Sequence, residues 1–476
     1  MNLLQIEWGV VGVKAGQLLL SLSILVILHE FGHFITARWF GCRVEKFYLF
    51  FDPWFSLFKK KINDTEYGIG WLPLGGYVKI SGMIDESMDK EAMNEEPKPW
   101  EFRSKPAWQR LIIMLGGIIV NVLLAILIYA MVLFVWGDTK IPMSSLKYGI
   151  AFQDSLLFKI GLKPGDQIIS TDGEPLEYFN DATYRVFTSR SAVVRRDGKE
   201  ITLNFPESLI GDLIENKKKG MMIMPRVPAI VGKFGPDSSN FRHFGGLEGD
   251  IIKSINGHPI QYYDEIRSTL LSIVPDSIDF NIQWVDRLQF RIRPMLTEVN
   301  VGLEHKGVES TILVDLMDDM RLGIPIVGDF DVMDSLGYIK QVHKNYNLLE
   351  CIPAGYALTK SKLASYIDQF RLIFNTRTGA YKGLGGFKAM ANAFPGVWDW
   401  ESFWSMTALL SIILAFMNLL PIPALDGGHV VFTLYEIITR RKPNEKVMEY
   451  AQVAGMVILL GLMLAANAND WLGWGR

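Results

Sequence analysis

Four stretches of the chain are apolar over lengths that could cross a lipid bilayer. Spanning the hydrocarbon core takes roughly 20 helical residues, and the four stretches cover residues 16–40, 111–136, 403–420 and 451–466. Tryptophans flank the second stretch, open the third and follow the fourth, as expected where a chain crosses the membrane–water interface. The alternative, four buried core helices, would be unusual in one soluble protein. The sequence therefore predicts four transmembrane helices.

Basic residues beside these stretches predict which loops face the cytoplasm, because cytoplasmic loops carry an excess of Lys and Arg. Such residues follow the first stretch, precede the second and lie between the third and fourth: Arg38, Arg43, Lys46, Lys98, Arg103, Lys105, Arg110, Arg440, Arg441, Lys442 and Lys446. We therefore expect both termini and residues 137–400 to lie on the opposite side. The first stretch lacks the basic start and the small-residue cleavage site of a signal peptide, so we expect it to be retained.

The composition limits the chemistry that is available to the chain. It has 476 residues, a formal net charge of −3 and only two cysteines, Cys42 and Cys351. The predicted topology places these cysteines on opposite sides of the membrane, and two cysteines cannot build a disulfide framework or a cysteine-based zinc site. The near-neutral charge gives no reason to expect nucleic acid as a partner. Any metal site must use histidines and carboxylates.

Between the second and third apolar stretches, one sequence pattern occurs twice. Residues 165–181 (GDQIISTDGEPLEYFND) and 249–265 (GDIIKSINGHPIQYYDE) align without gaps and share seven residues. This pattern indicates two copies of one small domain, each with a strand, a tight Asp-Gly or Asn-Gly turn and a helix start. The stretch GLKPGDQIISTDGEPL closely resembles the circularly permuted PDZ domains of bacterial proteases. PDZ domains bind extended peptides at a sheet edge; the alternative is that the copies act as rigid spacers.

The first apolar stretch contains the motif HEFGH at residues 29–33. Ionisable side chains inside a membrane span are costly and tend to mark a functional site. His29 and His33 are four residues apart on one helix face, within reach of one metal ion, and Glu30 beside them could take a proton from a bound water. The motif therefore predicts a metal-binding helix.

A catalytic zinc site usually has three protein ligands and one open position. Asp64 and Glu66 are of suitable type but lie in a polar loop. Asp426, in NLLPIPALDGGH, directly follows the third apolar stretch, where two prolines end the helix and two glycines allow close approach of the backbone. We favour Asp426 as the third ligand, with the nearby His429 as the competing candidate.

The pairing of HEFGH in the first span with NLLPIPALDGGH by the third resembles the site-2 protease family of intramembrane zinc metalloproteases. The resemblance covers nearly the whole chain. It implies that Zn²⁺ is bound by His29, His33 and Asp426 and that Glu30 is the catalytic base. It also implies substrate-binding roles for Asn418, for the Gly-x-Gly element Gly68–Ile69–Gly70 and for Asn121, which matches the asparagine of the family's second span.

The same resemblance implies a fold and a setting. The expected fold is an α-helical membrane protein with four transmembrane helices, a membrane-dipping β-structure and two tandem α+β PDZ domains on the periplasmic side of a bacterial inner membrane. The expected segments are a membrane part with spans one and two, the zinc motif and a cytoplasmic β-loop (1–140), a first PDZ domain (141–222), a second PDZ domain (223–327), a periplasmic linker (328–400) and a membrane part with spans three and four (401–476). Within the linker, residues 344–376 are partly amphipathic at helical spacing, so we expect a helix that lies on the far membrane surface and helps gate entry.

The expected substrates are single-span membrane proteins, above all a pre-trimmed anti-sigma factor in envelope-stress signalling, and remnant signal peptides. A transmembrane helix must unwind before it can be cut, and unwound backbone in lipid needs hydrogen-bonding partners. Residues 66–82, EYGIGWLPLGGYVKISG, alternate and are rich in glycine, so they are a candidate β-edge for the substrate; the alternative is an ordinary cytoplasmic hairpin.

The chain departs from the family pattern in two places. GGIIVN (116–121) lacks the proline often found before the asparagine, and LGGFKAM (384–390) stands where the family often has an SGPI-like stretch. Both departures concern the substrate-facing details and leave the expected metal ligands in place. A different class of function also fits the motifs, namely a non-catalytic membrane scaffold whose PDZ pair captures peptides and whose metal is structural, with His429 as a fourth ligand.

Overall fold

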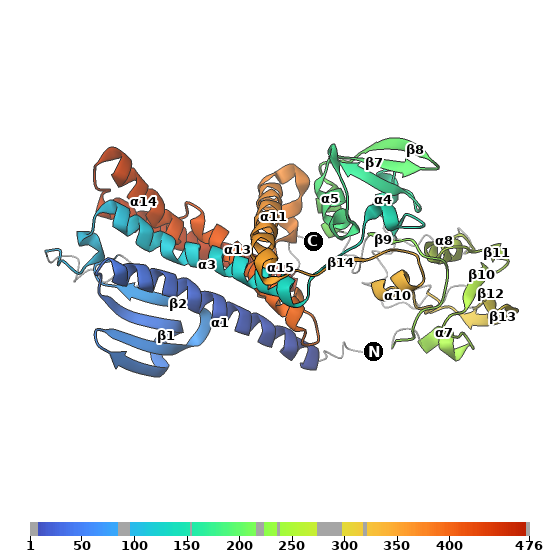
Figure 1. Ribbon diagram of the computed structural model, residues 1–476, viewed down its shortest axis with the longest axis horizontal. Helices are drawn as coiled ribbons and strands as arrows, with labels where there is room; N and C mark the ends of the chain where they lie inside the picture. Colours follow the sequence, from blue (N-terminus) through green and yellow to red (C-terminus); the bar gives the residue numbers. More distant parts are fainter. Residues whose placement is uncertain are drawn as a thin grey trace. The chain divides into compact units, whose positions relative to one another are not determined.

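The computed structural model describes residues 8–83, 96–152, 155–215, 223–235, 239–273, 298–317 and 321–472. The chain divides into two compact units (Figure 1). The first unit consists of Met1–Asp138, Lys344–Thr376 and Ala380–Arg476, and the second of Thr139–His343 and Arg377–Gly379. The membrane-length helices all belong to the first unit.

Four helices of the first unit are long and apolar enough to cross a membrane, as the sequence predicts. They are α1 (Trp8–Trp39), α3 (Ala107–Val135), α13 (Trp400–Leu419) and α15 (Glu445–Leu472). The unit also contains α11 (Leu348–Phe374), α12 (Phe387–Asn392), α14 (Asp426–Thr439), η1 (Phe102–Ser104) and η6 (Ala380–Gly383).

Local sequence signals explain where α11 and α13 begin. The side chain of Asn347 accepts hydrogen bonds from the first turn of α11, and Glu350 bonds back to the backbone of Asn347, which completes a capping box. Asp399 caps α13 by accepting a hydrogen bond from the main-chain N–H of Ser402, and the hydrogen bonds from Ser402 lower the pKa of the Asp399 carboxyl. α13 ends just before Pro421, which cannot continue a helix.

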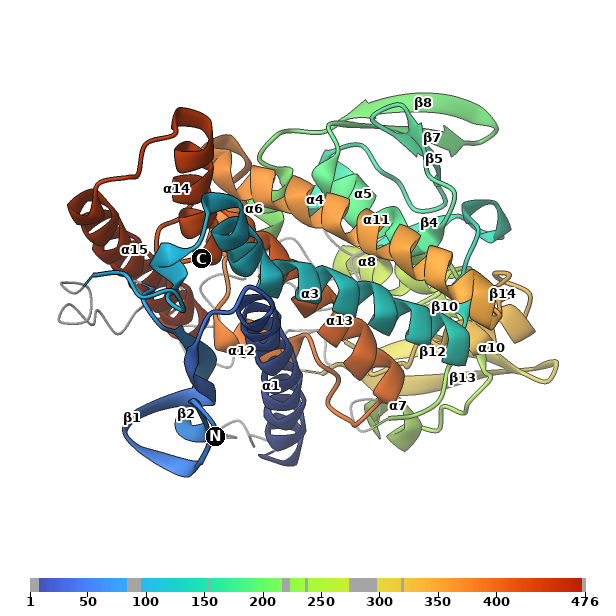
Figure 2. The ribbon, with the colours of Figure 1, turned by 60° about the vertical axis from the view of Figure 1, so that its left-hand side comes forward.

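α3 is the central helix of the first unit and packs against α1, α11, α13 and α14 (Figure 2). Its approach to α1 requires glycine, because a Cβ atom on Gly32 would collide with the carbonyl oxygen of Gly116, and one on Gly116 would lie 2.5 Å from the carbonyl oxygen of Gly32. Small residues at such crossings let membrane helices approach closely. α11 packs on α3 through Gly355.

A two-stranded sheet lies against α1 and consists of β1 (Val44–Ile62) and β2 (Thr65–Ile80). Residues 46–49 of β1 align with 66–69 of β2 on one side and with 76–79 on the other, while residues 58–62 pair with 65–69. Both long strands therefore fold back on themselves, and residues 76–80 form an edge. The candidate segment 66–82 is thus largely extended, and its dipping into the membrane stays a prediction.

The second unit contains two four-stranded sheets with the same strand order, β6-β5-β7-β8 and β11-β10-β12-β13. The first comprises β5 (Gln167–Thr171), β6 (Glu174–Pro175), β7 (Ser191–Arg196) and β8 (Lys199–Asn204). The second comprises β10 (Ile251–Ile255), β11 (His258–Pro259), β12 (Glu298–His305) and β13 (Val308–Asp315). The two aligned sequence stretches open these two sheets. Their identification as PDZ domains stays a prediction.

Short elements complete the second unit. The helices are α4 (Ser155–Lys159), α5 (Ala182–Thr188), α6 (Leu209–Glu215), α7 (Ser239–His243), α8 (Tyr263–Ile273), α10 (Phe330–Ser335), η2 (Met143–Ser145) and η3 (Phe179–Asp181). A further pair of strands is β4 (Ile150–Phe152) with β9 (Ile223–Pro225). Three short elements lie where the chain passes from one unit to the other: the strands β3 (Asp138–Lys140) and β14 (Val342–Lys344) and the helix η5 (Thr376–Thr378).

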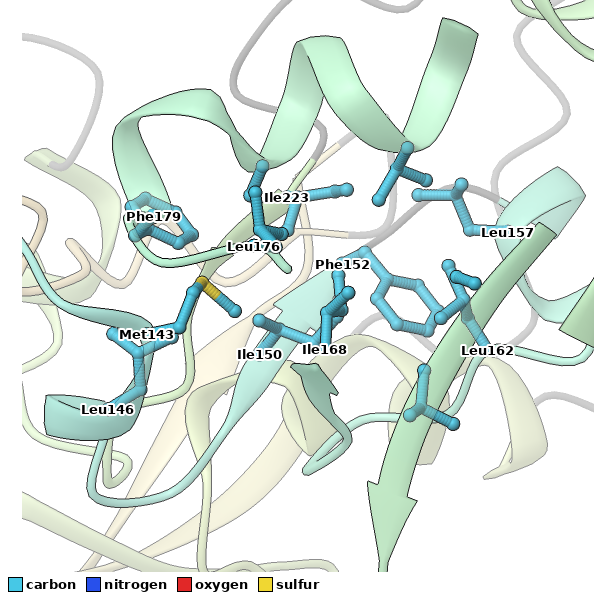
Figure 3. Close-up of a cluster of buried hydrophobic side chains, with 14 of the residues drawn as sticks. Met143, Leu146, Ile150, Phe152, Leu157, Leu162, Ile168, Leu176, Phe179 and Ile223 are labelled. Carbon is cyan, nitrogen blue, oxygen red and sulfur yellow. The ribbon is translucent and has the colours of Figure 1, made fainter. Parts of the chain in front are cut away.

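Each four-stranded sheet of the second unit packs against its own apolar core. Figure 3 shows part of the first core, in which Ile150, Phe152 and Ile168 are nearly inaccessible to solvent. The second core is built around Phe241, Ile252, Val299 and other buried side chains of the second sheet. Two separate cores agree with two copies of one domain.

Candidate metal centre

Three side chains that are far apart in the sequence converge beside α1. Oδ2 of Asp426 lies 3.1 Å from Nε2 of His29 and 3.2 Å from Nε2 of His33, and the two nitrogens are 3.3 Å apart. Two imidazoles and a carboxylate form a donor set that suits zinc and leaves a fourth position open. Within the described part of the chain, this is the one group of three or more His, Cys, Asp or Glu side chains gathered closely enough to hold a metal ion.

The loop before α14 explains how Asp426 reaches the two histidines. A Cβ atom on Gly427 would collide with the carbonyl oxygen of Leu420, and one on Gly428 would lie 2.7 Å from Cα of Pro423. Ala424 has a φ of 80°, so the chain turns sharply between the end of α13 and the start of α14. Asp426 is consequently the first residue of α14 and lies beside α1.

α3 supports the two histidines from the other side. His33 Nδ1–H donates a hydrogen bond of 2.9 Å to the carbonyl oxygen of Ile113, so its Nε2 is left to bind a metal. A Cβ atom on Gly117 would lie 2.5 Å from Nε2 of His33 and 2.6 Å from Cε1 of His29. Glycine at position 117 therefore makes room for both imidazoles.

Asn418 and Asn121, the two asparagines that the family resemblance implicates, both contact His29. Nδ2 of Asn418 lies 3.2 Å from Nε2 of His29, next to the candidate metal position. Nδ2 of Asn121 lies 3.0 Å from Nδ1, the other ring nitrogen. Oδ1 of Asn121 is buried and has no hydrogen-bond partner. Oδ1 of Asn121 is thus an unpaired acceptor close to Nδ1 of His29, the ring nitrogen that faces away from the candidate metal position. Such an acceptor fits a metal site in which the ligand histidine donates its second N–H to a neighbouring group.

A cavity of about 730 Å³ opens beside the three candidate ligands. It is lined by Glu30, by residues 51–53 of β1, by residues 76–80 of β2, by His429 of α14 and by Gln452 of α15. Glu30 and Val78 of the strand edge both line this cavity. The cavity therefore brings an acidic side chain, the candidate metal centre and a strand edge together.

The edge strand reaches the cavity because residue 76 is glycine. A Cβ atom on Gly76 would lie 2.7 Å from both the carbonyl oxygen of Tyr48 and Cγ1 of Val26, and 3.6 Å from Cγ of Glu30. The strand thus runs directly against α1 at Glu30.

The predicted Gly-x-Gly element lies elsewhere in the sheet. A Cβ atom on Gly68 would collide with the Tyr48 ring, and one on Gly70 would collide with the backbone of Phe51. Gly68, Ile69 and Gly70 are not among the residues that line the cavity. The structure brings His29, Glu30, His33, Asn121, Asn418 and Asp426 together and leaves this element apart.

Among the polar residues of the cavity wall that the sequence does not indicate are Asp52 and Tyr77. The Tyr77 hydroxyl donates to Oδ1 of Asp52 over 2.9 Å, and the Ser56 hydroxyl donates to Oδ2 over 2.9 Å. Burial and the neighbouring Asp52 carboxylate raise the pKa of Tyr77, so its hydroxyl stays a donor. Asp52 lies in β1 and Tyr77 in β2, and they meet only because the long hairpin folds back on itself. No spacing in the sequence indicates this contact.

Comparison with known proteins identifies the family. Residues 17–462 match the sequence profile of peptidase family M50. The chain belongs to peptidase family M50. The resemblance to site-2 proteases is thereby confirmed, and the protein is a metalloprotease of a family that uses zinc.

Relatives extend over nearly the whole chain. Several have names that include the words zinc metalloprotease, among them one from Xylella fastidiosa that is 28% identical over 96% of this chain and 98% of its own length. A metalloprotease of Caulobacter vibrioides is 27% identical over 95% of this chain and 94% of its own length. The regulator of sigma E protease of Haemophilus influenzae is 28% identical, over 96% and 98% respectively.

Proposed function

We propose that this M50 metalloprotease cuts the transmembrane segment of single-span membrane proteins, with His29, His33 and Asp426 as zinc ligands and Glu30 as the catalytic base. The observation that carries the proposal is the convergence of these side chains at one cavity, within a unit that contains four membrane-length helices. The donor set is incomplete for a closed structural site, since His429 lines the cavity but is not part of the three-residue group found among the described residues. This argues against the scaffold alternative.

The residues of the site divide the chemistry among them. When bound, zinc activates a water molecule and polarises the scissile carbonyl. Glu30 is placed to take the proton from that water and to pass it to the leaving amine. Asn418, whose amide lies beside Nε2 of His29, is placed to hold the substrate backbone near the reacting carbonyl.

The strand edge at residues 76–80 supplies hydrogen-bonding groups for an unwound substrate. A transmembrane helix hides its carbonyls in its own hydrogen bonds, and unpaired backbone groups in lipid cost several kcal/mol each. An edge strand next to Glu30 can pair with the substrate by strand addition. We therefore assign substrate binding to this edge, in the segment 66–82 that the sequence suggests.

The substrate class is proposed from the relatives and the predicted topology. One relative is named for the regulation of sigma E, which supports a pre-trimmed anti-sigma factor in envelope-stress signalling, with remnant signal peptides as a second group. We place the protein in a bacterial inner membrane with both termini and the two PDZ copies in the periplasm. There the PDZ copies screen substrates by size, and the segment 344–376 helps gate entry.

Cleavage of a defined substrate tests the proposal. The purified full chain is incubated with a tagged single-span peptide, with and without a zinc chelator, and the products are mapped by mass spectrometry. We expect a cut inside the apolar segment that stops with the chelator and returns when zinc is restored. A cut that falls only outside the apolar segment, or that is insensitive to the chelator, would refute intramembrane zinc-dependent cleavage.

A further inference from the structure

Asn121 contacts a candidate zinc ligand from the side away from the metal. It lies in α3, is completely buried, and places Nδ2 at 3.0 Å from Nδ1 of His29. Its main-chain carbonyl accepts a hydrogen bond of 2.8 Å from the hydroxyl of Ser411 in α13. This hydrogen bond ties the backbone of Asn121 in α3 to α13, and the buried carboxamide lies beside the His29 ring.

The direction of that carboxamide matters for metal binding. Nε2 of His29 faces Asp426 and His33, so a metal must be bound through Nε2, and the neutral ring then carries its proton on Nδ1. With Nδ2 of Asn121 facing Nδ1, two N–H donors would oppose each other. The two ends of a carboxamide are nearly equal in shape, so a half turn about Cβ–Cγ brings Oδ1, which has no partner, onto Nδ1–H.

We propose that Asn121 is a positioning residue that accepts the Nδ1–H hydrogen bond of His29 and so fixes the ring and the tautomer that bind zinc. His33 receives the same support from the carbonyl oxygen of Ile113. α3 thus supplies one main-chain and one side-chain acceptor, and Gly117 between them leaves room for both rings. This role differs from the substrate-binding role expected from the sequence, and it rests on the proposed metal centre.

Zinc affinity of substituted full-length chains tests the inference. The dissociation constant is measured in detergent by competition with a coloured chelator. Because outer hydrogen-bond partners of metal ligands typically change metal affinity by about 10- to 100-fold, we expect Asn121→Leu to weaken zinc binding by such a factor. Asn121→Asp should stay within about threefold of wild type or bind more tightly, because a carboxylate also accepts from Nδ1–H.

The relative zinc affinities of Asn121→Leu and Asn121→Asp distinguish a positioning role of Asn121 from a role in packing alone. If Asn121 only fills space, a buried unpaired carboxylate is the more damaging change, and Asn121→Asp would bind zinc no better than Asn121→Leu. The control is Thr407→Val, which removes a buried hydroxyl that contacts Ser21 and should leave zinc affinity unchanged. If Asn121→Leu does not fold, Asn121→Ser, which is too short to reach the ring, takes its place against Asn121→Asp.

Two results would overturn the inference: zinc affinity within twofold of wild type in Asn121→Leu, or zinc binding by Asn121→Asp that is equal to or weaker than that of Asn121→Leu. His33→Ala distinguishes this failure from a failure of the metal centre. If His33→Ala abolishes zinc binding while Asn121→Leu does not alter it, only the positioning role is lost. If His33→Ala binds zinc like wild type, the proposed metal centre itself is wrong, and the inference falls with it.

Discussion

Glu30 is the one acidic side chain of the HEFGH motif, and it lines the cavity without belonging to the group of three candidate ligands. Glu30→Gln keeps the size of the side chain but removes the base. We expect the variant to lose about 10²- to 10⁴-fold in cleavage rate, the range typical of a general base, while its zinc content stays at the wild-type level. Single-turnover cleavage of the tagged peptide and metal analysis measure the two quantities.

Asp426→Asn is the matched control for Glu30→Gln. It also replaces one carboxylate by an amide, but at a candidate ligand, so both zinc content and cleavage should fall. Full proteolysis by purified Glu30→Gln would refute the catalytic role of Glu30. Loss of zinc from Glu30→Gln would instead place Glu30 among the ligands.

The contrast between ligands and their supports shows what single residues reveal in a sequence. His29, His33 and Asp426 stand out because ionisable side chains at i, i+4 and after a broken span are rare in apolar surroundings. The acceptor for His33 is a main-chain carbonyl, which any residue at position 113 would provide. The sequence points to Asn121 only through the family resemblance, and the contact of Asn121 with His29 depends on the crossing of α1 and α3.

At the scale of helices, the crossing of α1 and α3 depends on Gly32 within HEFGH. A Cβ atom there would collide with the carbonyl oxygen of Gly116, so Gly32→Ala should push the helices apart. Overpacking of this kind costs about 1–3 kcal/mol, and the thermal midpoint of the protein in detergent should fall along with its zinc affinity. The supports for His29 and His33 would move away with α3.

Gly16→Ala is the control for Gly32→Ala on the same helix. A Cβ atom at residue 16 meets nothing within 4 Å, and replacing Gly by Ala in a helix favours the helix by up to about 1 kcal/mol. We therefore expect an unchanged or raised midpoint and unchanged zinc affinity. Equal behaviour of the two variants would argue that the close crossing does not hold the metal centre.

The edge strand of β2 carries a separate prediction. Gly76→Ala would place a methyl group against Tyr48, Val26 and Glu30, which forces the edge away from α1. Zinc binding should persist, since no candidate ligand lies on β2. Cleavage should fall by about 10²-fold, because a displacement of about 1 Å in a positioned substrate can cost that much. A fully active Gly76→Ala enzyme would contradict substrate pairing at this edge.

The sheet also marks a limit of prediction from the sequence. The alternating, glycine-rich pattern of 66–82 indicates strands, and β2 covers most of that segment. The pattern cannot say which part reaches the cavity, because that depends on how a long hairpin folds back and on which glycine meets which helix. Gly68 and Gly70 accommodate Tyr48 and Phe51 inside the sheet, whereas Gly76 admits the strand to Glu30.

For the whole molecule, the length of the apolar stretches predicts the four membrane-length helices. The internal sequence alignment predicts two copies of one small domain, and the two four-stranded sheets with the same strand order agree with it. α11 shows the limit at this scale. The sequence predicts an amphipathic helix on the membrane surface near 344–376, and in the structure α11 packs on α3 through Gly355. Its position relative to a membrane stays a prediction. Packing between helices that are far apart in the sequence left no local signal.

We expect the second unit as a whole to discriminate between substrates by their size. Two substrates share one transmembrane segment, and one of them carries a folded domain on the predicted periplasmic side. Steric exclusion is a form of discrimination against the wrong partner, so the full chain should cut the short substrate at least about tenfold faster, a difference of about 1.4 kcal/mol. Deleting residues 141–327 should bring the two rates together, provided that zinc content shows an intact metal centre. If the shortened enzyme still prefers the short substrate to the same degree, the size filter lies in the first unit and not in the two repeated domains of the second unit.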